Sequence, residues 1–157
     1  MKLWRIATET RQFKAQDLSG AGAAKHPGRW NADNEPVVYT APSIALAVLE
    51  TAAYINPSGL PLNRFLIEIS VPEAVWAARK QLQLADLEPA WAAVPAGPVT
   101  VKAGSAWLTS RESALLLVPS VIVPEESCVL INPAHADSAK ITAKVLRRFE
   151  YGALFRC

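Results

Sequence analysis

The sequence predicts an α+β domain with mainly antiparallel or mixed sheets. Short apolar and β-branched runs lie towards both ends of the chain, helix-forming segments lie between them, and no regular strand–helix–strand alternation is present. At 157 residues the chain fits one domain that is long enough to bury a core, so we expect a single domain over residues 1–157. A composition of 51% hydrophobic and 19% charged residues indicates a folded chain rather than a disordered one.

The first part of the chain predicts two strands separated by a long loop. Residues 2–7 form the first strand, with Leu3, Arg5 and Ala7 on one face. Residues 14–28 contain three glycines and a proline without a clear period, which is typical of a loop. The β-branched and aromatic run VVYT at 37–40 predicts the second strand.

A helix is predicted over residues 42–55, because the segment is rich in alanine and leucine and Pro42 suits an early helical position. The stretch NPSG at 56–59 ends the pattern. Helical spacing places Glu50 on one stripe with Ser43, Ala47 and Tyr54. We expect Leu46, Leu49 and Ala53 to pack beside that stripe.

The second part of the chain predicts more strands and helices. Residues 64–71 alternate as a half-buried strand, residues 73–98 hold short helical pieces, and 99–111 form a helix that Gly104 weakens. Two buried strands follow at 114–118 and 128–131, and 141–149 forms a last edge strand.

Several classes of function are disfavoured by composition and motifs. A formal charge of +2 is too small for the electrostatic footprint of a nucleic-acid-binding protein. The N-terminal segment lacks the apolar region of a signal peptide, and no apolar run is long enough to span a bilayer, so we expect a cytoplasmic protein without a membrane partner. Two cysteines, Cys128 and Cys157, and two histidines without ligand spacing predict neither a disulfide nor a metal site.

Arg29 lies between Gly28 and Trp30 in the stretch KHPGRWN at 25–31, just before the second strand. Its planar donor fork is suited to a bidentate grip on phosphates. The alternative is a surface arginine stacked on Trp30.

Glu50 is the lone carboxylate of a largely apolar helix, and positions 46 and 54 offer it no basic partner. In a cleft it could stabilise a cationic sugar transition state, whereas on an outer face it would simply be solvated.

Tyr39 and Ser120 each allow two interpretations as well. Tyr39 is a stacking platform for a base or an ordinary half-buried strand tyrosine. Ser120, in VPSVIVP, is a well-fixed hydroxyl after a buried strand or a turn residue.

Taken in order, the motifs GRWN, VVYT, ALAVLE and LLLVPSVIVPEESCVLINP resemble the RES-domain toxins of bacterial toxin–antitoxin pairs. That family is named for an arginine, a glutamate and a serine, which match Arg29, Glu50 and Ser120. The resemblance extends from LWRI at the start to RRFEYGALF near the end. It implies an ADP-ribosyltransferase-like fold in which mixed or antiparallel sheets with flanking helices enclose an NAD cleft.

The resemblance also implies an activity and a set of roles. The expected reaction is cleavage of the nicotinamide–ribose bond of NAD⁺ by hydrolysis or phosphorolysis, which would deplete the cell of NAD⁺ and arrest growth. Glu50 would stabilise the oxocarbenium-like ribose, Ser120 would orient the ribose or carboxamide, and Arg29 would hold the phosphates. The further residues expected to contact NAD⁺ are Arg5, Trp30, Asn31, Tyr39, Thr40 and Tyr54, with His26 near the cleft mouth. No metal is expected.

The resemblance implies a partner too, a small helical Xre-like antitoxin that blocks the active site. Two other functions remain open. One is an ADP-ribosyltransferase that modifies a cellular protein, and the other is a non-catalytic domain that binds nucleotides or proteins.

Overall fold

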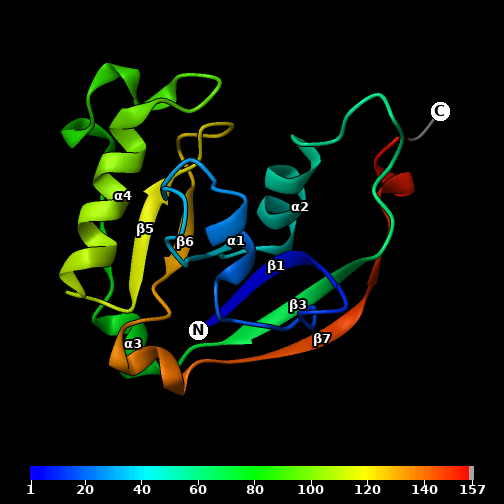
Figure 1. Ribbon diagram of the computed structural model, residues 1–157, viewed down its shortest axis with the longest axis horizontal. Helices are drawn as coiled ribbons and strands as arrows, with labels where there is room; N and C mark the ends of the chain where they lie inside the picture. Colours follow the sequence, from blue (N-terminus) through cyan, green and yellow to red (C-terminus); the bar gives the residue numbers. More distant parts are fainter. Residues whose placement is uncertain (156–157) are drawn as a thin grey trace.

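The computed structural model contains two small sheets flanked by helices, and it describes residues 1–155 (Figure 1). Sheet A is antiparallel, with the order β1 (Lys2–Thr8), β3 (Arg64–Ser70) and β7 (Thr142–Phe149). Sheet B has the order β2 (Val38–Thr40), β6 (Ser127–Ile131), β5 (Leu115–Pro119) and β4 (Lys80–Gln81). The short β4 pairs parallel to β5 and the other pairs are antiparallel, which confirms the α+β prediction with antiparallel and mixed sheets.

The helices occupy the connections between strands. The α-helices are α1 (Ala21–Lys25), α2 (Ile44–Ala52), α3 (Glu73–Ala77) and α4 (Pro98–Ser110). The 3₁₀ helices are η1 (Leu84–Asp86), η2 (Pro89–Ala92), η3 (Ala136–Lys140) and η4 (Tyr151–Leu154). None of the helices within residues 1–155 has the length and apolar character needed to cross a membrane.

Hydrophobic clusters join the two sheets and seat the helices. The central cluster combines Leu3, Ile67 and Ile69 of sheet A with Leu115, Val129 and Ile131 of sheet B. A second cluster packs α4 onto sheet B (Figure 1). A third cluster packs α2 and the C-terminal η4 onto sheet A.

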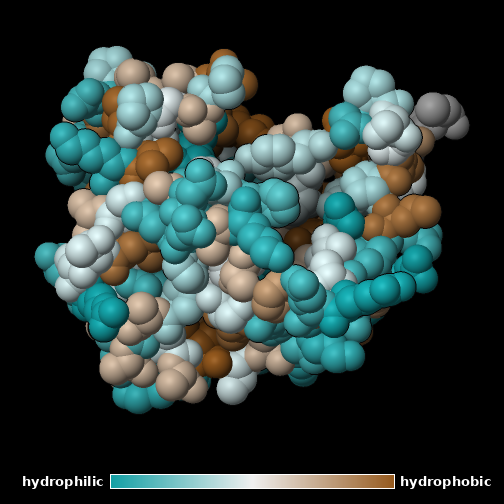
Figure 2. Space-filling view, in the orientation of Figure 1, coloured by the Kyte–Doolittle hydropathy of each residue, from teal (hydrophilic) through white to brown (hydrophobic). Residues whose placement is uncertain are grey.

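The edge strand β7 exposes several charged side chains together with the apolar Val145 and Leu146. Lys144, Arg147 and Arg148 are exposed, and Lys144 pairs with Glu68 of β3 at 3.2 Å. In Figure 2 hydrophilic side chains dominate the surface over β3 and β7. Charged side chains on an edge strand oppose pairing with other chains.

The helix predicted at 42–55 is shorter in the structure, because Ser43 caps its N-terminus. The Ser43 hydroxyl accepts a hydrogen bond from the Leu46 N–H at 3.1 Å, so Pro42 lies before the helix and not inside it. The expected packing of Leu49 and Ala53 was wrong, since both are exposed. The predicted loop at 14–28 also contains the short helix α1.

Candidate active site

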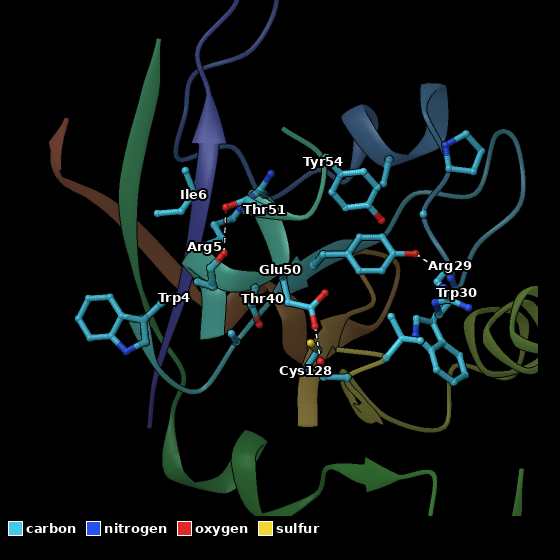
Figure 3. A pocket seen from close by; sticks show the side chains of 18 of the residues that line it. Trp4, Arg5, Ile6, Arg29, Trp30, Thr40, Glu50, Thr51, Tyr54 and Cys128 are labelled. Atoms are coloured by element: carbon cyan, nitrogen blue, oxygen red, sulfur yellow. Dashed lines mark hydrogen bonds between the residues drawn. The ribbon is translucent and has the colours of Figure 1, made fainter. Parts of the chain in front are cut away.

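A cavity of about 490 Å³ opens between α2, the segment 23–30, β1, β2 and the β5–β6 connection. This volume is typical of small-molecule sites. Nearly all of the residues predicted for the site line it, namely Arg5, Arg29, Trp30, Tyr39, Thr40, Glu50, Tyr54 and Ser120, together with His26. Elements far apart in the sequence therefore place the predicted set around one cavity (Figure 3).

Glu50 and Ser120 form a short hydrogen bond in this cavity. The Ser120 hydroxyl donates a hydrogen bond of 2.5 Å to Glu50 Oε1. Ser120 is 1% exposed, and its Oγ accepts the backbone N–H groups of Ile122 and Val123, both at 3.1 Å. The turn after β5 thus fixes the serine, and the serine fixes one oxygen of the carboxylate. This arrangement excludes the alternative of a freely solvated Glu50.

Tyr39 is half-buried between the cavity and the loop that carries Arg29. Its hydroxyl donates to Asn31 Oδ1 at 2.7 Å and accepts the Trp30 N–H at 3.0 Å. Burial raises the pKa of the Tyr39 phenol well above its ordinary value, and the hydrogen bond from the Trp30 N–H acts in the opposite direction. The ring lines the cavity as a neutral aromatic surface.

Asn31 does not line the cavity, contrary to the prediction that it contacts NAD⁺. It is 1% exposed, and its Oδ1 accepts from the Gly28 N–H at 2.8 Å as well as from Tyr39. Its Nδ2 donates to three backbone carbonyls, those of Ala23, Ala32 and Glu35. Every donor and acceptor of the amide is used within the protein, so Asn31 shapes the loop and leaves nothing for a ligand.

Arg29 lines the cavity, but its guanidinium is engaged with the protein. Nη1 donates to the backbone carbonyls of Trp91 at 3.0 Å and Ala93 at 2.8 Å. Trp30 is 3% exposed and packs in the cluster beneath α4, so it offers little surface on which an exposed arginine could stack. Arg29 ties the loop at 26–31 to η2, and one edge of its donor fork remains for a ligand.

Gly28 leaves room for the side chain of Tyr39. A Cβ at this position would lie 2.7 Å from the hydroxyl oxygen and Cζ of Tyr39. The glycine is therefore required by the Tyr39 ring, which the loop covers.

Arg5 lies on β1 beneath the cavity and also borders a smaller cavity of about 150 Å³. Nη1 donates to the Asp17 carbonyl at 3.3 Å. Desolvation by burial lowers the pKa of the Arg5 guanidinium, and the Asp17 carboxylate acts in the opposite direction. A desolvated guanidinium with spare N–H groups beside a cavity is suited to an anionic group.

Thr40 and Tyr54 differ in what they offer to a ligand. The Thr40 hydroxyl donates to the Val129 carbonyl at 2.7 Å within sheet B, so it has no hydrogen left to donate into the cavity. Tyr54 is 77% exposed and stands at the mouth, where Figure 3 shows its ring above Glu50.

Among the cavity-lining residues outside the candidate set, Cys128 and Thr51 carry a thiol and a hydroxyl. Cys128 lies opposite Val118 in the β5–β6 pair, so pairing the two predicted strands around Ser120 would have brought it to the site. Thr51 follows Glu50 on α2, and the buried Tyr151 hydroxyl donates to its Oγ1 at 2.8 Å. No local pattern indicates that contact, because the two residues are 100 positions apart.

Within residues 1–155 no group of three or more His, Cys, Asp or Glu side chains is placed to hold a metal ion. Cys128 is a free thiol, and the prediction made for Cys157 lies outside the described residues.

Comparison with known proteins places the chain in a family. The model of the RES domain family matches residues 2–152, and the chain belongs to that family. The resemblance seen in the motifs is thereby confirmed.

Relatives and a solved structure agree with this family. The chain is 52% identical to the "Prs ADP-ribosylating toxin" of Sphingobium sp., over 94% of this chain and 92% of the relative. It is 39% identical to the "Toxin Res" of Pseudomonas putida, over 90% of this chain and 92% of the relative. The fold is similar to that of a chain in the M. tuberculosis MbcT–MbcA toxin–antitoxin complex, with a TM-score of 0.57 and 19% identity over 93% of this chain and 84% of that chain.

Proposed function

We propose that this chain is the toxin of a toxin–antitoxin pair and an enzyme that cleaves the nicotinamide–ribose bond of NAD⁺ and transfers ADP-ribose to a protein. The observation that carries the proposal is the Glu50 carboxylate held by Ser120 at the wall of a ligand-sized cavity. The choice of a protein acceptor is supported by the name of the relative that is 52% identical, a toxin that ADP-ribosylates Prs.

Glu50 suits the bond-breaking step for an electrostatic reason. As nicotinamide leaves with the bonding electrons, the ribose acquires oxocarbenium character, and a fixed carboxylate interacts more strongly with that cation than with the ground state. The Ser120 hydrogen bond occupies Oε1, which leaves the second oxygen for the ribose. Because Ser120 is itself fixed by two backbone N–H groups, little reorganisation is needed during the reaction.

The other cavity residues divide between binding and shape. Arg5 would hold the diphosphate, because its guanidinium is desolvated and has N–H groups to spare. The neutral ring of Tyr39 would stack on the nicotinamide. Arg29 Nη1 holds η2 in place, and the remaining N–H groups of the Arg29 guanidinium would donate to the diphosphate.

The mouth of the cavity supports the proposed partners. Tyr54 is largely exposed beside Glu50, and an exposed aromatic is a typical anchor for a protein partner. We expect the mouth to receive the acceptor protein when the toxin is active, and a helical Xre-like antitoxin when it is blocked. Both partners would be cytoplasmic.

The test uses NAD⁺ labelled in its adenine, incubated with the wild type and with Glu50→Gln. We expect the wild type to release nicotinamide and to label added Prs, and the variant to lose both activities by about 10²-fold or more because Gln has the same shape without the charge. Glu112→Gln, an exposed carboxylate outside the cavity, is the matched control.

Three results would redirect the proposal. Label that remains free in solution would assign water as the acceptor, and a requirement for phosphate would assign phosphorolysis. Nicotinamide release by Glu50→Gln at the wild-type rate would exclude the mechanism.

A further inference from the structure

Cys128 places a thiol beside the Glu50 carboxylate. It lines the same cavity, and Figure 3 shows its sulfur next to Glu50. The residue lies on β6 and packs in the small cluster that contains Leu46 and Ala47 of α2. The strand and the helix are therefore held against each other where the carboxylate projects.

Glu50 has acceptor capacity that Ser120 does not use. An ionised carboxylate offers about four lone-pair positions, and the Ser120 hydroxyl has one hydrogen to donate, which goes to Oε1. A second neutral donor at this place would restrict rotation of the carboxylate and stabilise its charge. The Cys128 thiol, which lines the cavity next to Glu50, is the side chain in position to do so.

The protonation state of the thiol favours donation over nucleophilic chemistry. Burial raises the pKa of the Cys128 thiol above its ordinary value, and the adjacent Glu50 charge raises it further. The residue is thus kept as S–H, the form that can donate a hydrogen bond, and away from the thiolate that reacts with oxidants and alkylating reagents.

We propose that Cys128 is a positioning residue for Glu50, whose thiol donates a second hydrogen bond to the carboxylate and, with Ser120, fixes the carboxylate against sheet B. Its importance for catalysis rests on the proposed function, whereas the contact itself does not. Cys128 makes no bond to substrate in this proposal and acts through Glu50.

Kinetics of two substitutions test the positioning role. Cys128→Ala removes the donor, and we expect kcat for nicotinamide release to fall about tenfold with KM little changed. Cys128→Ser keeps a donor of similar size and should recover most of kcat. A Cys128→Ala enzyme with wild-type kcat would overturn the proposal, as would a Cys128→Ser enzyme no better than Cys128→Ala.

Infrared spectroscopy tests the contact without any turnover. The chain has two cysteines, so in a Cys157→Ser background the S–H stretching band reports Cys128 alone. We expect this band at lower frequency with Glu50 present than in Glu50→Ala, because donation to a carboxylate weakens the S–H bond. An identical band in both proteins would refute the contact. A band that responds to Glu50 in a protein that does not consume NAD⁺ would support the contact while the proposed function fails.

Discussion

Asn31 illustrates how a single side chain organises the candidate site without facing the ligand. Its amide joins the loop at 28–35, the Ala23 carbonyl of α1 and the Tyr39 hydroxyl in one hydrogen-bonded group. The loop that presents Arg29 and the ring that lines the cavity are thereby held in one arrangement. The motif GRWN thus combines Arg29, which lines the cavity, with Trp30, which packs in the core, and Asn31, which fixes the turn.

Asn31→Asp is expected to destabilise the protein although it preserves shape. The aspartate cannot donate to the three carbonyls and would bury a charge, at a cost of about 2–4 kcal/mol in the free energy of unfolding. Asp33→Asn, an exposed change in the same loop, is the matched control and should stay within about 0.5 kcal/mol. Urea unfolding measures both. Equal stabilities of the two variants would mean that the Asn31 bonds are not what holds the loop.

At the scale of elements, α4 and the loop at 26–31 touch backbone to backbone. A Cβ at Gly104 would lie 1.7 Å from the Trp30 carbonyl oxygen, so the glycine allows the helix to approach the loop closely. Arg29 of the same loop bonds to the carbonyls of Trp91 and Ala93 at η2, and the Trp30 N–H bonds to Tyr39 of β2. The loop therefore contacts sheet B, α4 and the segment that precedes α4.

Gly104→Ala is therefore expected to destabilise the protein even though alanine favours helix by about 1 kcal/mol. The overlap with the Trp30 backbone forces α4 and the loop apart, at a cost of about 3 kcal/mol or more in the free energy of unfolding. Gly22→Ala, in α1 with open space around its Cβ, should be neutral or slightly stabilising. The urea midpoints of the two variants test this prediction. A Gly104→Ala protein more stable than the wild type would show that the Gly104–Trp30 contact can accommodate a methyl group.

The same contact explains what could be predicted from the sequence and what could not. Strands and helices with a clear period, such as 64–71, were found, because a buried face dictates which residues alternate. Gly104 counted against a helix, since propensity is a local quantity and the close approach to Trp30 is a tertiary one. The motifs placed Glu50 and Ser120 in one candidate site, and the structure joins them by a hydrogen bond. The hydrogen bonds of Asn31, Arg29 and Tyr151 depend on packing between distant segments, which no local sequence pattern indicates.

At the scale of the whole molecule, the two sheets and α2 surround two ionisable side chains whose burial favours the neutral form over the charged form. Tyr39 and Cys128 lie on different strands of sheet B and both line the cavity. Burial raises the pKa of each above its ordinary value, 10.0 for the tyrosine and 9.0 for the cysteine. Ionisation of these two side chains is therefore coupled to unfolding, and the free energy of unfolding depends on pH in the alkaline range.

This linkage predicts that stability declines at alkaline pH partly through Tyr39. In the unfolded chain the phenol loses its proton near pH 10, whereas the folded protein retains it, so above that pH the folded state binds more protons than the unfolded state. The contribution is complete below pH 10 and is lost as the pH rises, by up to about 1.4 kcal/mol per pH unit. Tyr39→Phe begins less stable, because the phenol bonds to Asn31 and Trp30 are gone, but its free energy of unfolding should fall less steeply above pH 10. The exposed Tyr54→Phe should follow the slope of the wild type, and parallel curves for Tyr39→Phe and the wild type between pH 9 and 11 would show that Tyr39 ionises as easily in the folded protein as in the unfolded chain.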